Sequence, residues 1–475
     1  MAESSQSCQP DFDRGLYFFM SSIVRVARLL MVGVLISSVA ACAAYRPEPL
    51  QGPDVEASLQ DPAVPSLVQQ AGGLRHALIA PVVLDPSAPL TLDAVTVIAV
   101  IANPDLAALR VQQQVADAQV FASGLFPDPQ LSLGIDRVLS PSGAGLVTAY
   151  TGGLSLDVLG KFFTRRTDQE VARNAARQLR LDVAWAEWNT GGGARLQAIR
   201  QHYLARIDVL GRSAAVLATR LLESIDDAVA RGDLKGDDLQ AQRNAALDVA
   251  LRADTASKAL EANRLELNHM LGLRPDSAVR LATLVVGEPP TLPSTAELFA
   301  AARRQRLDLQ ALEQGYAGQE ANVARAVLGQ YPRVGITLNR ARDTSAVHTW
   351  GPAVNLDLPL WNRNRGEIAL TSATRAQLRA EFVARLHQTR ADIVTLVAAL
   401  NTDQRTLRTA RGEATLLQGS VAAYEAAAER GDLTRGVVDA TRLTAIDKQI
   451  AVLSLEQSCA EQRVALALMT GDPFP

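Results

Sequence analysis

The chain has 475 residues, of which 48% are hydrophobic and only 4% aromatic, and its 47 basic and 50 acidic side chains give a formal net charge of −3. This near-neutral balance argues against a nucleic-acid-binding protein, because such proteins carry a basic surface that neutralises phosphates. The 3 cysteines cannot form a disulfide framework, and no cysteine or histidine spacing indicates a zinc site.

The first 41 residues have the pattern of a signal peptide. Arg25 and Arg28 precede an apolar run at 29–41, which is too short for a stable transmembrane helix. Residues 1–19 contain acidic side chains that do not suit such a leader. We therefore expect a signal peptide over residues 1–41, with Met20 as the candidate true start.

The apolar run ends in Val39-Ala40-Ala41-Cys42, which resembles a bacterial lipobox. The resemblance implies cleavage before Cys42 and acylation of its thiol, which would anchor the mature chain in a membrane. The alternative is an ordinary signal peptide with an incidental cysteine. Residues 42–90 are rich in proline, and we expect an extended segment that runs over a surface.

The rest of the chain is one unit that occurs twice. Five short segments recur in the same order about 200 residues apart, and the sequence RGDL, for example, occurs at 231–234 and again at 430–433. Such a series of matches is hard to obtain by chance. We therefore expect two repeats, over 91–285 and 286–475.

Each repeat is expected to contain a helix, two strands, a very long helix, a turn and a second very long helix. No proline occurs between Pro141 and Pro275 or between Pro359 and Pro473, and a proline inside a helix costs about 3 kcal/mol. The strands show alternation of apolar and polar residues. The apolar positions are Leu131, Leu133, Ile135, Leu154, Leu156, Val158, Val334, Ile336, Leu338, Trp350, Val354, Leu356 and Leu358. The fold class is therefore mainly α with a small β part.

The long helices carry small residues and leucines at steps of three and four, which is typical of a coiled-coil seam. We expect the two RGDL segments to be the turns of antiparallel helical hairpins, with Gly232 and Gly431 at positive φ. The triplet Gly191-Gly192-Gly193 lies inside the first long helix. Because each glycine costs about 1 kcal/mol in a helix interior, we expect a kink or local unwinding there.

Four strands with one apolar face cannot close a barrel alone, and exposed sheet edges are not tolerated in lipid. Three copies would supply twelve strands around a polar lumen. The pattern therefore favours a trimer with a shared barrel. The alternative is a soluble helical protein with two small surface hairpins.

From about residue 90 to its C-terminus the chain resembles the TolC-type outer-membrane efflux proteins. The segments that carry the resemblance are 90–119, FPDPQLSLG at 126–134, the RGDL turns, NHMLGL at 268–273 and NRGEIA at 364–369. The resemblance implies a homotrimer in the outer membrane of a Gram-negative bacterium, with a twelve-stranded barrel, an α-helical periplasmic tunnel and a lipid anchor. It implies a passive conduit without cofactor or enzymatic activity. It also implies two partners, a periplasmic adaptor (membrane fusion) protein and an inner-membrane transporter of the RND type. Residues 156–166 are similar to the heavy-metal subgroup.

The resemblance also assigns roles to the two turns. It places Asp237 and Asp238 at the gate-lining position of the first repeat, with Asp439 as their counterpart in the second. The residues that would dock the adaptor are Arg231, Gly232, Asp233, Leu234, Arg430, Gly431, Asp432 and Leu433. Threefold symmetry would turn each carboxylate into a ring that favours cations. The alternative is a solvated turn with ordinary helix-capping aspartates.

No nucleophile–base arrangement, phosphate-binding loop or histidine cluster in the sequence indicates catalysis or a metal site. A rival function from another class is a non-channel periplasmic coiled-coil lipoprotein, which would act as an adaptor or a scaffold. The two helical hairpins and the small number of strands favour the channel.

Overall fold

The computed structural model describes residues 45–137, 148–156, 158–284, 292–343, 345 and 347–473. The chain divides into two compact units, residues 1–59 and residues 60–475. The described part of the first unit contains one short helix, α2 (Pro53–Ser58), whose proline stands in the first turn, where a missing N–H breaks no helical hydrogen bond. The expected signal peptide, the start at Met20 and the acylated Cys42 all lie outside the described residues.

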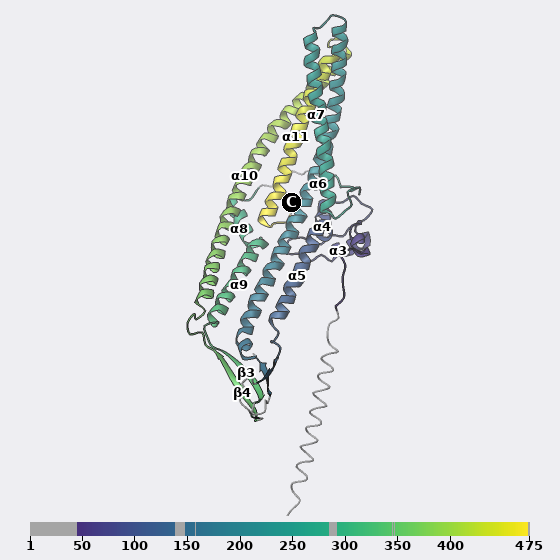
Figure 1. The fold of residues 1–475 in the computed structure, drawn as a ribbon. Coiled ribbons are helices and arrows are strands. Elements are labelled where there is room, and N and C mark those ends of the chain that lie inside the picture. Colours follow the sequence, from purple (N-terminus) through teal and green to yellow (C-terminus); the bar gives the residue numbers. More distant parts are fainter. Residues whose placement is uncertain are drawn as a thin grey trace, which may run out of the picture. The chain divides into compact units, whose positions relative to one another are not determined.

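The second unit begins with α3 (Val64–Gly72), and the same six elements then follow twice in the same order (Figure 1). The first repeat consists of α4 (Leu92–Ala102), α5 (Pro104–Ser123), β1 (Gln130–Asp136), β2 (Ala149–Leu156), α6 (Val158–Ala230) and α7 (Gly236–Met270). The second repeat consists of α8 (Thr295–Gln305), α9 (Leu307–Leu328), β3 (Arg333–Arg342), β4 (His348–Asp357), α10 (Arg365–Glu429) and α11 (Arg435–Thr470). The mainly α fold with a small β part is confirmed, except that each repeat opens with two helices where one was expected.

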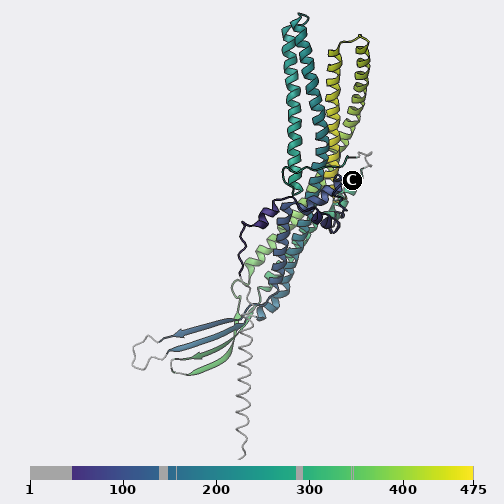
Figure 2. The ribbon, with the colours of Figure 1, turned by 90° about the vertical axis from the view of Figure 1, so that its right-hand side faces the viewer.

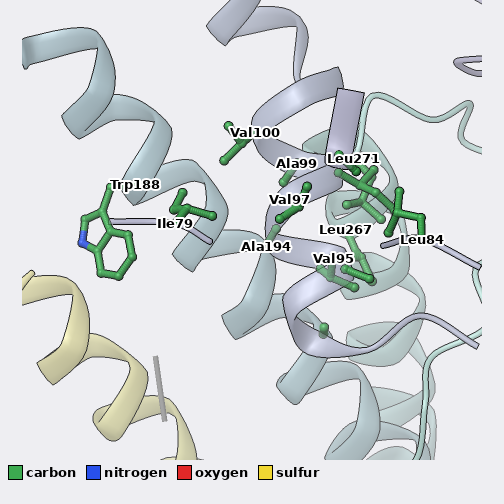
Figure 3. Packing of buried hydrophobic residues seen from close by; sticks show 14 residues of the cluster. Ile79, Leu84, Val95, Val97, Ala99, Val100, Trp188, Ala194, Leu267 and Leu271 are labelled. Atoms are coloured by element: carbon green, nitrogen blue, oxygen red, sulfur yellow. The ribbon is translucent and has the colours of Figure 1, made fainter. Parts of the chain in front are cut away.

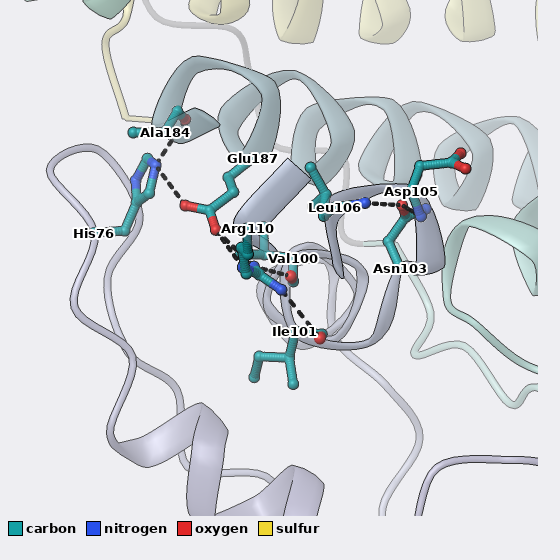
Figure 4. Close-up of polar contacts among 9 residues, drawn as sticks. All are labelled: His76, Val100, Ile101, Asn103, Asp105, Leu106, Arg110, Ala184 and Glu187. Atoms are coloured by element: carbon teal, nitrogen blue, oxygen red, sulfur yellow. Dashed lines mark hydrogen bonds and ion pairs between the residues drawn. The ribbon is translucent and has the colours of Figure 1, made fainter. Parts of the chain in front are cut away.

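The opening helix of the first repeat is divided at Asn103. A residue that precedes proline is disfavoured in the helical conformation, and Asn103 is followed by Pro104 and has extended backbone angles. The Asn103 side chain then caps α5, because its Oδ1 accepts hydrogen bonds from the N–H groups of Asp105 at 3.0 Å and Leu106 at 3.1 Å (Figure 4). No single helix in the described ranges is long and apolar enough to cross a membrane, although α4 and α5 taken together as a pair bent by 50° pass that test by length and composition.

The strands form one antiparallel sheet, which among the described residues has four strands in the order β1-β2-β3-β4. Leu131 pairs with Leu154, which pairs with Leu338, so the expected apolar positions of neighbouring strands fall on one face. Two positions were assigned wrongly, because Val158 already begins α6 and Leu358 follows the end of β4. The hairpins of the two repeats are thus joined through β2 and β3, and β1 and β4 are the two edges.

The long helices extend from the sheet at one end to the two helical turns at the other, as Figures 1 and 2 both show. Helix α6 is central, because it packs against α4, α5, α7, α9 and α11. The largest hydrophobic cluster surrounds α4 midway along the helices, where Val95, Trp188 and Leu271 are fully buried (Figure 3).

The glycine triplet does not break α6, because the helix is continuous from Val158 to Ala230. The expected local unwinding is therefore wrong. Each glycine instead faces a different neighbour at close range. A Cβ atom added to Gly191 would lie 2.9 Å from the side chain of Thr96. The same atom on Gly192 would lie 2.3 Å from Leu468, and on Gly193 it would lie 2.7 Å from Met270. The triplet therefore lets α4, α11 and α7 approach the backbone of α6.

The proline-rich segment is extended only in part, since α3 lies within it and Ala71, Ile79 and Leu84 are buried in the cluster around α4. His76 anchors this segment to α6 (Figure 4). Its Nε2 lies 2.9 Å from the carbonyl oxygen of Ala184, and its Nδ1 accepts hydrogen bonds from backbone N–H groups two and three residues later. The apolar residues between the prolines explain the difference, because burying them stabilises the segment against the helices.

Candidate functional site

Both RGDL segments form the turn of a helical hairpin, as expected. The first tip (residues 231–235) joins α6 to α7, and the second tip (residues 430–434) joins α10 to α11. Gly232 has a φ of 82° and Gly431 a φ of 83°, which confirms the expected positive values. At the first tip the N–H of Asp233 donates to the carbonyl oxygen of Ala228 at 2.9 Å, and the equivalent bond recurs at the second tip, so both helices end in a Schellman motif.

The arginine of each RGDL segment pairs with the aspartate of the same turn. Arg231 Nε lies 3.1 Å from Asp233 Oδ2, and Arg430 Nε lies 3.0 Å from Asp432 Oδ2. All four side chains are more than half exposed, so each pair contributes at most about 1 kcal/mol. These pairs shape the individual turn and leave its outer surface polar and accessible.

Asp237 and Asp238 lie side by side in the first turn of α7 and are both exposed. The carboxylate of Asp238 accepts a hydrogen bond from the backbone N–H of Lys235 at 3.1 Å, which stabilises the start of the helix. Two negative charges at a helix N-terminus are also favoured by the helix dipole. The structure thus places both residues next to the first tip, in the first turn of α7, and gives Asp238 a capping role.

Asp439 lies near the second tip, within α11, and in a different environment. It stands in the second turn of α11, its side chain is 18% exposed, and its Oδ1 is 3.7 Å from Arg442 Nη1. Arg442 also donates to Glu425 on α10, with its Nε 2.7 Å from Glu425 Oε1. The gate candidates of the two repeats therefore lie in different environments, since Asp237 and Asp238 are exposed whereas Asp439 is 18% exposed and lies beside Arg442.

Ion pairs along the hairpins were not anticipated from the sequence. Arg243 on α7 lies 3.6 Å from Asp226 on α6, and Arg252 on α7 lies 3.7 Å from Asp447 on α11, which connects the two hairpins. The antiparallel hairpin predicted from the sequence brings the segments of Asp226 and Arg243 side by side, and the opposite charges of the two residues are the signal that could have indicated this pair. The second pair depends on how the two hairpins pack, which the sequence alone does not specify.

One face of the sheet is apolar and exposed. The exposed fraction is 78% for Leu133, 71% for Ile135 and 63% for Val354. The opposite face carries small and polar residues, and Asn355 Nδ2 donates to Thr337 Oγ1 at 2.8 Å across two strands. The exposed apolar face is stable only when other apolar groups cover it.

A cavity of about 970 Å³ lies between α6, α10, α11 and residues 279–283. Its ionisable lining residues are His202, Arg206, Arg411 and Glu456. Burial lowers the pKa of His202, and the nearby Arg206 lowers it further.

Residues 298–472 match the model of the outer membrane efflux protein family. No curated protein matches the sequence significantly.

Several solved structures share the fold. The CmeC outer membrane channel of Campylobacter jejuni has a TM-score of 0.66 and 17% identity, and the similarity covers 81% of this chain and 86% of that one. The open state of the MtrE outer membrane channel of Neisseria gonorrhoeae has a TM-score of 0.61 and 18% identity, with 81% and 89% covered. The outer membrane protein VceC of Vibrio cholerae has a TM-score of 0.62 and 15% identity, with 81% and 97% covered.

Proposed function

We propose that the chain is a member of the outer membrane efflux protein family, whose model matches its residues 298–472, and that it acts as a passive trimeric conduit from the periplasm to the exterior. The resemblance found in the sequence is confirmed by the family match over 298–472 and by the shared fold. The protein is the outer-membrane channel component of a tripartite efflux system. The number of copies, the partners and the gate are proposals, which we take in turn.

The trimer is supported by the sheet. Its edge strands β1 and β4 are unpaired within the described chain, while one sheet face is exposed and apolar. With four strands in antiparallel order, β4 of one copy and β1 of the next run in opposite directions and can continue the ladder. Three copies would give a closed barrel of twelve strands, and closure removes every edge.

The helical part is suited to span a distance. Helix α6 has 73 residues and, at 1.5 Å per residue, reaches about 110 Å. Three copies of the two hairpins would surround a tunnel that ends at the tips. There a periplasmic adaptor would dock through Arg231, Gly232, Asp233 and Leu234 and their counterparts Arg430 to Leu433. An inner-membrane transporter of the RND type would supply the energy. The heavy-metal subgroup remains a prediction from residues 156–166.

The gate is assigned to the first tip. Because Asp237 and Asp238 are exposed, three copies would bring six carboxylates to the tunnel entrance. Such a ring favours cations, and salt bridges of its carboxylates to arginines of neighbouring helices would hold the entrance closed. Asp439 is the weaker gate candidate, since its carboxylate lies within reach of Arg442.

The observation that carries the proposal is the exposed apolar face of the sheet. It occurs together with two helical hairpins in a chain whose second repeat matches the family. The test is purification from the outer membrane, followed by electrophoresis with and without heating and by conductance in planar bilayers. We expect a heat-modifiable trimer that forms discrete channels. A soluble monomer after removal of the leader would instead support the adaptor or scaffold.

A further inference from the structure

The exposed apolar face of the sheet is called the outward face below. It becomes basic at the end of the sheet that is farthest from the helices. Along β3 its residues are Val334, Ile336 and Leu338, and then Arg340 and Arg342. The alternation of a strand places all five on one face, because successive side chains point to opposite faces. Two arginines thus stand at the loop end of a face that is otherwise apolar along this strand.

Aromatic residues accompany these arginines in the neighbouring strands. Arg340 pairs with Trp350 on β4, and Arg342 pairs with Tyr150 on β2. Trp350 is 71% exposed and Tyr150 is 49% exposed. Tryptophan and tyrosine are enriched where a membrane protein meets the headgroup region, and arginine on a lipid-facing surface is tolerated there but not at the bilayer midplane.

The length of the strand agrees with this placement. Strand β3 has 10 residues, which rise about 33 Å and, with the usual tilt of about 40°, cover the roughly 25 Å of an apolar band. The pairing of β3 with β4 begins at Arg333, next to the helices. Arg340 and Arg342 therefore lie at the opposite boundary of the apolar band. In the proposed function this is the boundary with the exterior.

Neither arginine has an acidic partner among the described residues. The carboxylate of Asp343 accepts hydrogen bonds from the N–H groups of Ser345 and Val347, both at 2.9 Å, and is used to form the β3–β4 turn. Asp136 belongs to the polar face, because it alternates with Ile135. In addition, Arg342 Nε is buried and has no hydrogen-bond partner in the described structure. An unsatisfied guanidinium nitrogen of this kind requires an acceptor.

We propose that Arg340 and Arg342, flanked by Trp350 and Tyr150, bind the phosphate group of a membrane lipid at the outer edge of the sheet. The two residues are about 7 Å apart along the strand, so both long side chains can reach one headgroup. Guanidinium groups bind phosphate with two parallel hydrogen bonds, while the aromatic rings pack against the lipid below the headgroup. This inference rests on the proposed function, because it requires the sheet face to lie in a membrane.

The test measures lipid retention by the full-length purified trimer. The protein is reconstituted in phosphatidylcholine vesicles that contain a minor fraction of phosphatidic acid, extracted with mild detergent, and assayed for bound phosphatidic acid by mass spectrometry. We expect Arg340→Gln and Arg342→Gln each to weaken retention about fivefold, and the double variant about 25-fold, which corresponds to about 1 kcal/mol per arginine. The variant Arg340→Lys/Arg342→Lys should retain more lipid than the double glutamine variant, because it keeps both charges, but less than the wild type, because lysine cannot form the two parallel hydrogen bonds.

The matched control is Arg325→Gln/Arg333→Gln, which removes two charges away from the outward face and should leave retention unchanged. Equal retention by wild type and the double glutamine variant would overturn the proposal, as would an equal loss in the control. Displacement of the lipid by excess inorganic phosphate would identify a site for a free anion and overturn the assignment to a lipid. Conductance of the same samples separates the two proposals: normal channels with unchanged lipid retention refute only the lipid site, whereas absence of trimers and channels in the wild type refutes the proposed function.

Discussion

The substitution Gly192→Ala tests how closely the two repeats pack midway along the helices. In a helix interior, alanine is favoured over glycine by about 1 kcal/mol, so on propensity alone the change would stabilise the protein. The new Cβ, however, would lie 2.3 Å from Leu468 Cδ2, 2.8 Å from its Cγ and 3.0 Å from its Cδ1. Rotation of the side-chain end cannot relieve a contact with Cγ, and the backbone of Leu468 is held by a hydrogen bond from Trp188 at 3.2 Å.

Overpacking of this kind costs about 1–3 kcal/mol, so Gly192→Ala should lower the free energy of unfolding by up to about 2 kcal/mol after the gain in propensity. Gly193→Ala is the matched comparison. Its Cβ would meet only the terminal methyl group of Met270 at 2.7 Å and the Sδ at 3.9 Å. Methionine is unbranched and can move away, so this variant should be as stable as the wild type or more stable.

The assay is thermal unfolding of the detergent-solubilised protein, followed by circular dichroism of its helices at one fixed scan rate. The midpoint temperature of unfolding is expected to be highest for Gly193→Ala, lower for the wild type and lowest for Gly192→Ala. If Gly192→Ala melted at or above Gly193→Ala, the close approach of α11 to α6 at this point would be incorrect, and the triplet would have to be explained by local flexibility.

Three further predictions concern the tip, the anchor and the cavity. The variant Asp237→Ala/Asp238→Ala should raise single-channel conductance in planar bilayers, because it removes the proposed ring of carboxylates; an unchanged conductance in an intact trimer would count against the gate. Cys42→Ser should abolish metabolic labelling with palmitate, and persistence of the label would contradict acylation at this residue. His202→Gln should lose less stability than the wild type when the pH falls. Burial and Arg206 hold the folded-state pKa of His202 below its ordinary value of 6.5, so the contribution of this group to stability is complete above that pH and is lost as the pH falls below it. Parallel melting curves of the two proteins between pH 7.5 and pH 5.5 would refute that role of His202.

Features determined by local chemistry were predictable from the sequence. Gly232 and Gly431 were expected at positive φ because the residue after a helix often adopts the left-handed conformation, which glycine tolerates best. The strand faces followed from the alternation of residues such as Leu131 and Leu133. The division at Asn103 was missed, although Pro104 is itself a local signal that disfavours a helical residue before it.

Features that depend on distant neighbours were not predictable. The cost of Gly192 in a helix is visible in the sequence, but Leu468, which requires the space, lies in the other repeat. The contact between Arg252 and Asp447 likewise depends on the packing of two hairpins. The apolar positions predicted for β3 end at Leu338, whereas the pairing extends to Arg342, so the basic end of the outward face was not predicted.

The central claim is that sheets of separate copies close into one barrel, and it is tested most directly by cross-linking strand β1 of one copy to strand β4 of the next. Single cysteines are introduced along both strands in a background without Cys8 and Cys459, and the protein is oxidised in the membrane. Closure predicts that cross-linked products reach a covalent trimer and stop there. Products that remain monomeric at every pair of positions, or a series that continues beyond three copies, would contradict it.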